Sequence, residues 1–115
     1  MKRRSLILVI CLLLLMVTSI SGCTKVTKIA DITTNSAQYD GKTVNISGYV
    51  DNSIWVALTG RGAYQVDDGS ASIWVVTNQE PPAKGVKVSV RGSVSPAFTL
   101  GDKTLGTVVH ETERN

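Results

Sequence analysis

Residue types that bind metals or act as nucleophiles are scarce in this sequence. Its 115 residues include one histidine, His110, and two cysteines, Cys11 and Cys23. A structural zinc site normally takes four His or Cys ligands, and covalent catalysis needs a nucleophile beside a base. A glycine-rich phosphate loop is also lacking, because the Gly-Arg-Gly motif at residues 60–62 is not followed by a predicted helix. We therefore expect no metal site, no cofactor and no catalytic residues, and do not expect an enzyme.

Long apolar runs are limited to one, the 15 residues 6–20, which are interrupted only by Thr18 and Ser19. Three positive residues precede this run: Lys2, Arg3 and Arg4. A helix of this length spans about 22 Å, which is less than the ~30 Å hydrocarbon core of a bilayer. The run is therefore short for a transmembrane anchor and is typical of a signal peptide.

The residues that follow the run are Ile20, Ser21, Gly22 and Cys23. They resemble the lipobox of prokaryotic lipoproteins, in which an aliphatic residue and two small residues precede a lipid-modified cysteine. The resemblance implies that residues 1–22 are removed and that Cys23 carries a diacylglycerol. The protein would then be anchored by lipid to the cell membrane or outer membrane, facing the extracytoplasmic side. The alternative is an ordinary signal peptide with an incidental cysteine.

Removal of residues 1–22 would change the charge of the chain. The net charge of +3 includes the three positive residues before the apolar run, whereas all nine acidic residues follow Cys23. The remaining 93 residues would therefore carry nine basic and nine acidic side chains. A neutral domain lacks the overall basic character that is the usual electrostatic footprint of nucleic-acid binding, although Lys84, Lys87 and Arg91 lie close together in the sequence.

The residues after the signal peptide predict one small all-β domain. We expect residues 23–30 to form a tether, residues 31–110 the domain and residues 111–115 a polar tail. Alternating apolar residues or β-branched runs predict strands at residues 44–50, 63–66, 72–77, 86–90 and 104–110, and residues 54–58 either continue the first strand or form a hairpin arm. Thr33, Thr34 or Asn35 would cap a short helix that ends at Tyr39.

Three segments together resemble the OB-fold of nucleic-acid-binding domains, the tRNA anticodon-binding domains among them. They are the glycine-containing strand at residues 41–50, the motif Tyr-Gln-Val-Asp-Asp-Gly-Ser-Ala-Ser-Ile-Trp-Val at residues 64–75, and the alternating valines at residues 86–94. The resemblance implies a five-stranded Greek-key barrel with a short N-terminal helix. It also implies a hairpin turn at Asp68 and Gly69 between the second and third strands. Residues 78–85 contain two prolines and are too few for the usual full helix between the third and fourth strands. The side chains expected to point inward are Val66, Ile73, Val75, Val86, Val88, Val90 and Val108.

OB-folds bind ligands on the outer face of the second and third strands, between two flanking loops. On this basis the candidate ligand face consists of Tyr49, Trp55, Arg61, Gln65, Asp67, Trp74, Lys87 and Phe98. The alternative for each aromatic residue is a packing role, against the helix or over an open end of the barrel. His110 and Glu111 also resemble, in position, the haem-binding region of the haem chaperone of cytochrome c maturation, but the tyrosine that follows there is absent here.

Two functions remain open after the sequence alone. The first hypothesis is a monomeric, non-catalytic binding module that is lipid-anchored in the cell envelope and has a protein, a glycan or a small ligand as its partner. The alternative is a protein that binds single-stranded nucleic acid, which the neutral charge and the export signal disfavour.

Overall fold

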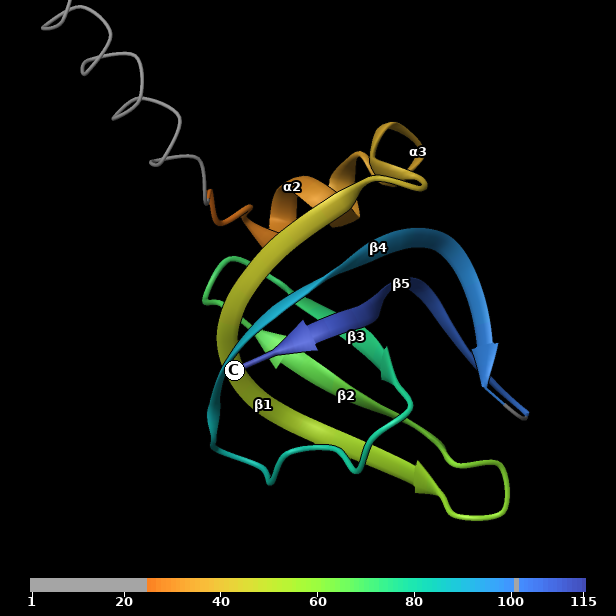
Figure 1. Cartoon of the computed structure of the whole chain (residues 1–115). Coiled ribbons are helices and arrows are strands. Elements are labelled where there is room, and N and C mark those ends of the chain that lie inside the picture. Colours follow the sequence, from red (N-terminus) through yellow and green to blue (C-terminus); the bar gives the residue numbers. More distant parts are fainter. Residues whose placement is uncertain (1–24, 101) are drawn as a thin grey trace, which may run out of the picture.

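The computed structural model describes residues 25–100 and 102–115 (Figure 1). Its elements are α2 (Ile29–Thr34), α3 (Ser36–Tyr39), β1 (Thr43–Val56), β2 (Arg61–Asp67), β3 (Ser72–Thr77), β4 (Lys87–Leu100) and β5 (Lys103–Arg114). The five strands form a closed barrel in the order β1-β2-β3-β5-β4, in which only β3 and β5 are parallel. This is the Greek-key barrel of an OB-fold, and it confirms the predicted fold class.

Strand β1 is long and bent, and it pairs with two neighbouring strands along its length. Its first half pairs with β4 and its second half pairs with β2. Gly48 lies where the two pairings meet, and a Cβ atom at this position would lie 2.3 Å from the backbone oxygen of Asp67. Only glycine allows the two strands to approach so closely.

The barrel interior is filled mainly by β-branched side chains, as the alternating sequence predicts. Val66, Ile73, Val75, Val88 and Val90 belong to the buried core cluster. Two predicted core residues differ from the observed core. Val86 is 45% exposed because it precedes β4 and lies in the connection from β3. Val108 is buried but lies outside the core cluster, in which its neighbour Val109 takes the inward position on β5.

The helices close the end of the barrel at the top of Figure 1. Helix α3 starts after Asn35 and ends at Tyr39, within the predicted range. Helix α2 was not predicted, because its first two residues were assigned to the tether. Ile29 and Ile32 of α2 are fully buried in the core cluster. The folded domain therefore begins at Ile29 or earlier, and not at residue 31.

The opposite end of the barrel has no helix, in agreement with the prediction for the β3–β4 connection. A Cβ atom on Gly62 would lie 2.7 Å from the Trp55 ring and 3.1 Å from the Pro81 ring. Trp55 and Pro81 therefore lie beside Gly62 at the end of the barrel where other OB-folds place a helix, and Trp55 covers it while remaining 43% exposed. Strand β5 also runs further than predicted, because residues 111–114 of the expected tail pair with β4 or complete the strand.

Candidate ligand-binding surfaces

The strand register divides the predicted ligand face into separate groups. Partners that lie directly opposite each other in a sheet project to the same face, so each row of partners can be followed across the barrel. One row contains Asn52, Gln65, Trp74, Val108 and Ser95, and the next contains Ile54, Ala63, Val76, His110 and Ser93. We call the outer surface formed by these two rows the β2–β3–β5 face.

The β2–β3–β5 face combines an apolar floor with polar and aromatic groups. Ala63, Val76 and Val108 are buried in it, although none of them belongs to the core inside the barrel. Gln65 and Trp74 lie side by side as direct partners on β2 and β3, and both are half-buried. Neither row contains a carboxylate, so a negatively charged ligand would meet no like charge within them.

One edge of this face is formed by Arg61, Phe98 and His110. The rings of Phe98 and His110 meet edge to face, with their centroids 5.0 Å apart. Burial lowers the pKa of His110, and the positive charge of Arg61 lowers it further. A neutral imidazole is therefore favoured beside the guanidinium group. The structure thus brings Arg61 and Phe98 to the edge of the face that carries Gln65 and Trp74.

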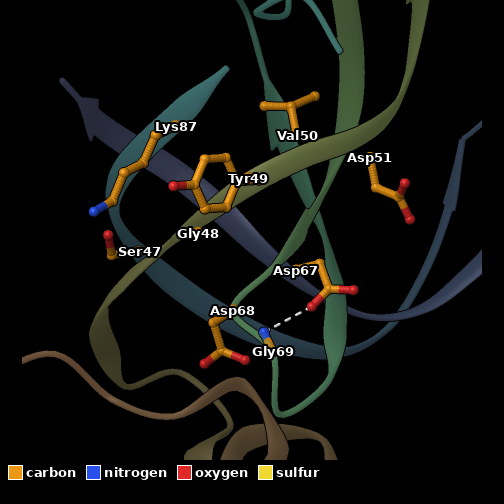
Figure 2. Close-up of a pocket in the computed structure, with 9 residues that line it drawn as sticks. All are labelled: Ser47, Gly48, Tyr49, Val50, Asp51, Asp67, Asp68, Gly69 and Lys87. Carbon is orange, nitrogen blue, oxygen red and sulfur yellow. Dashed lines mark hydrogen bonds between the residues drawn. The ribbon is translucent and has the colours of Figure 1, made fainter. Parts of the chain in front are cut away.

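Tyr49, Asp67 and Lys87 form a different group. Tyr49 is the partner of Lys87 on β4 and of Asp67 on β2, so the three side chains share one row. They line a groove of about 580 Å³ at the crossing of β1 and β2, beside the β2–β3 turn (Figure 2). Tyr49 is 57% exposed there. Figure 2 shows its ring beside Lys87, whereas Asp67 lies further along the groove and accepts a hydrogen bond from the Gly69 N–H at 2.7 Å.

Trp55 belongs to neither group, although the sequence placed it on the ligand face. Its partner on β2 is Gly62, and Gly62 is the partner of the buried Thr77 on β3. Trp55 therefore lies on the barrel-interior side of the sheet and covers the open end of the barrel. The bulge in β1 at residues 50–52 shifts the inward and outward alternation of the side chains by one residue, so Trp55 points inward where the sequence pattern places it outward.

The turn residues Asp68 and Gly69 connect the barrel to α2. Gly69 has a φ of 88°, a conformation that favours glycine. The Asp68 carboxylate accepts hydrogen bonds from the Ile29 N–H at 2.9 Å and from the Ser70 N–H at 2.9 Å. Partial burial raises the pKa of Asp68, but these hydrogen bonds outweigh it and lower the pKa overall. The β2–β3 turn thereby caps the first turn of α2, since Lys28 makes no side-chain cap.

Sequence reasoning missed a polar cluster inside the barrel, at the end covered by Trp55. The side chain of Glu111 is 5% exposed and accepts hydrogen bonds from the hydroxyl groups of Tyr64 and Thr77, the latter at 2.6 Å. Arg114 lies 3.5 Å from the same carboxylate and 5.4 Å from the Tyr64 ring centroid. Burial, followed by the bond to Glu111, raises the pKa of Tyr64. The available signal was the alternation of β2 and β3, which points Tyr64 and Thr77 inward.

Residues 25–100 and 102–115 contain neither a metal-binding cluster nor a membrane-spanning helix. No group of three or more His, Cys, Asp or Glu side chains in this part of the chain could hold a metal ion. None of the helices described there is long and apolar enough to cross a membrane. The predicted signal peptide and Cys23 lie outside the described residues.

The sequence matches no protein-family model and no curated protein. Its fold, however, is similar to parts of solved tRNA synthetases. Asparaginyl-tRNA synthetase from Pyrococcus horikoshii superimposes with a TM-score of 0.55 and 19% identity, over 68% of this chain and 19% of the synthetase. Aspartyl-tRNA synthetase from Entamoeba histolytica gives a TM-score of 0.61 and 12% identity, over 81% of this chain and 21% of the synthetase.

A third similar structure is an isolated domain of comparable size. It is the OBody AM3L09 bound to hen egg-white lysozyme, with a TM-score of 0.57 and 19% identity, over 78% of this chain and 92% of the OBody. This chain thus corresponds to about a fifth of each synthetase but to almost the whole OBody. At these low identities the likeness concerns the fold, and it supports the OB-fold that the strand order shows.

Proposed function

We propose that this protein is a non-catalytic OB-fold module that binds single-stranded nucleic acid across the β2–β3–β5 face. The observation that carries the proposal is the composition of this face. It combines Trp74, Gln65 and His110 with Arg61 and Phe98 at its edge, and its two rows contain no carboxylate. The fold similarity to two tRNA synthetases supports the same ligand class.

Each group on this face has a task that its chemistry suits. Trp74 offers an aromatic surface on which a base can stack, and stacking contributes about 1–3 kcal/mol per base. The Phe98–His110 pair offers a second aromatic surface, and Arg61 attracts the phosphate backbone. Gln65, beside Trp74, can both donate to and accept from a base edge. Because Arg61 is the main cation at this edge, we expect modest affinity with a weak dependence on salt.

The proposal is tested by titrating the full-length protein with ten-residue oligothymidylate and oligoadenylate while tryptophan fluorescence is recorded at low salt. A Trp55→Phe background leaves Trp74 as the only tryptophan. We expect quenching on binding, and the affinity should fall about tenfold or more in Trp74→Ala and several-fold in Arg61→Ala. Tyr49→Ala serves as the control, because Tyr49 lies in the separate groove. No quenching by either oligonucleotide at low salt would exclude the proposal.

We also propose, on a separate observation, that the module is held at the extracytoplasmic side of a membrane. That observation is the lipobox-like sequence that ends at Cys23, after a signal peptide of residues 1–22. In that location the module would act as an envelope protein, and a protein, a glycan or a small ligand would be available as a partner. The OBody bound to lysozyme is an example of this fold with a protein partner.

A further inference from the structure

The groove beside Tyr49 is a second surface that the proposed nucleic-acid face does not use. It lies in a different row of the sheet, at the crossing of β1 and β2, and is bounded by the β2–β3 turn. Its volume of about 580 Å³ falls within the range of small-ligand sites, which is about 300–1,000 Å³. The groove is therefore large enough for a ligand of its own.

Two of the three carboxylates around this groove are already engaged by the protein. Asp67 accepts hydrogen bonds from the Gly69 N–H at 2.7 Å and from the Ser72 hydroxyl at 3.2 Å. Asp68 caps α2 and accepts the Ser70 hydroxyl at 2.6 Å. The groups that remain available to a ligand are the Tyr49 ring, the Lys87 ammonium group and the exposed carboxylate of Asp51 (Figure 2).

The charge of the groove disfavours a polyanion. Asp51, Asp67 and Asp68 line it together with a single cation, Lys87. A phosphate chain would meet like charges from three carboxylates at short range, and one lysine would not compensate for them. The groove therefore does not favour the negatively charged ligand that is proposed for the β2–β3–β5 face.

A neutral ligand with an apolar ring face and many hydroxyl groups matches the remaining chemistry. Tyr49 is 57% exposed and presents its ring to the groove, so it can pack against the C–H face of a pyranose. Asp51 can accept hydrogen bonds from sugar hydroxyls, and Lys87 can donate to a ring or hydroxyl oxygen. Ser47, to which the Ser89 hydroxyl donates at 3.5 Å, adds a donor at the groove wall.

We infer that this groove binds a short neutral oligosaccharide, with Tyr49 as the stacking residue. The groove adjoins the proposed nucleic-acid face, since Asp67 and Gln65 are successive outward residues of β2, but the two surfaces are lined by different residues. A negative result for saccharide binding in the groove therefore does not count against nucleic-acid binding on the β2–β3–β5 face, and the reverse also holds.

The test uses the full-length protein in a detergent without a sugar headgroup. Chitotriose, cellotriose and maltotriose are titrated separately, up to about 10 mM, by isothermal calorimetry and by amide chemical shifts. We expect at least one trisaccharide to bind and to shift the amides of Tyr49, Asp51 and Gly69 but not the Trp74 indole. Tyr49→Ala should weaken this binding tenfold or more, Asp51→Ala several-fold, and Tyr49→Phe less than twofold.

Trp74→Ala is the matched control, because it removes an aromatic residue from the other face and should leave saccharide binding unchanged. Oligothymidylate is added as a competitor and should not displace the trisaccharide. The inference is overturned if none of the three trisaccharides binds, if binding is the same in Tyr49→Ala, or if the oligonucleotide competes.

Discussion

Glu111 shows how a single residue decides the character of one end of the barrel. Its carboxylate is almost fully enclosed, yet it accepts hydrogen bonds from Tyr64 and Thr77 and faces Arg114. A buried charge is tolerated only where such partners replace its hydration. The guanidinium of Arg114 is itself held by the side-chain oxygen of Gln79 at 3.3 Å and the backbone oxygen of Glu80 at 3.2 Å. The cluster therefore links β2, β3, β5 and the helix-free connection after β3.

Removing this carboxylate should destabilise the fold. Glu111→Ala leaves two buried hydroxyl groups without their acceptor and the Arg114 guanidinium without its ion-pair partner, so we expect the free energy of unfolding to fall by about 3 kcal/mol. Glu113→Ala, at an exposed position on the same strand, should change it by less than about 0.5 kcal/mol. Urea unfolding monitored by circular dichroism measures both. Equal stability of the two variants would contradict the structural role of the cluster.

We expect burial of Tyr64 to make the stability of the fold sensitive to alkaline pH. Its pKa in the folded state is raised above the ordinary value of 10.0, by burial first and then by Glu111. Between pH 10 and the raised pKa of the folded state, the unfolded chain loses the phenolic proton while the folded chain retains it. The free energy of unfolding therefore falls as pH rises through this range. The expected slope is about 1.4 kcal/mol per pH unit from pH 10 upward. Tyr64→Phe should lose this component of the slope, which unfolding at pH 9, 10 and 11 measures; an unchanged slope would contradict the assignment.

At the scale of the elements, hydrogen bonds join the β2–β3 turn and α2 into one unit. Asp68 and Ser70 of the turn accept the backbone N–H groups of Ile29 and Ala30, at 2.9 and 3.2 Å. Isolated helices as short as α2 are unstable in water, so α2 depends on this cap and on the burial of Ile29 and Ile32. The helix therefore closes the barrel because the turn holds its first residues and the core buries its two isoleucines.

Loss of this cap should be measurable as a loss of stability. Asp68→Ala removes the acceptor of the Ile29 N–H, and we expect a cost of about 1–2 kcal/mol in thermal or urea unfolding. The lowered pKa of Asp68 adds a pH signature, because its contribution is present at neutral pH and is lost as pH falls through the folded pKa. Asp51→Ala, which removes an exposed carboxylate, is the control. A cost that persists unchanged in strong acid would contradict the capping role.

At the scale of the whole molecule, the barrel presents two surfaces of different chemistry. The β2–β3–β5 face is aromatic with a cation at its edge, whereas the Tyr49 groove is lined by three carboxylates and one lysine. Their rows are neighbours on the outer wall of the barrel, because Asp67 lies two residues from Gln65 on β2 and Ser72 lies two residues from Trp74 on β3. A single small domain can therefore offer two ligand sites without a second core.

The proposed lipid anchor is a property of the whole molecule and has its own test. In cells of a bacterium that processes lipoproteins, the wild-type protein should sediment with membranes and incorporate labelled palmitate. Cys23→Ala should incorporate no label and should lose the processed, lipid-bearing form, because the thiol is the site of attachment. Cys11→Ala, which changes a residue of the predicted signal peptide, should behave as wild type. Labelling of the Cys23→Ala variant would exclude the anchor.

The sequence by itself determined the fold class. Alternating valines, the turn at Asp68 and Gly69, and Gly48 within the first strand are local signals, since side chains in a strand alternate and glycine alone fits a close strand crossing. The same alternation also predicted most of the core. It was wrong at Val86 and Val108, because the place where a strand begins and the register of the parallel β3–β5 pair are not local properties.

Only the tertiary structure decided how the polar and aromatic residues are grouped. The eight residues predicted as one ligand face fall into two surfaces, and Trp55 alone covers an end of the barrel. Trp55 is separated from the others because the bulge in β1 turns it toward the interior side. The sequence pattern placed Glu111 in a polar tail and Ile29 in a tether. In the structure, strand pairing buries Glu111 and the docking of α2 buries Ile29. Their burial depends on partners 34 to 47 residues away in the chain, and no local pattern encodes contacts at that separation.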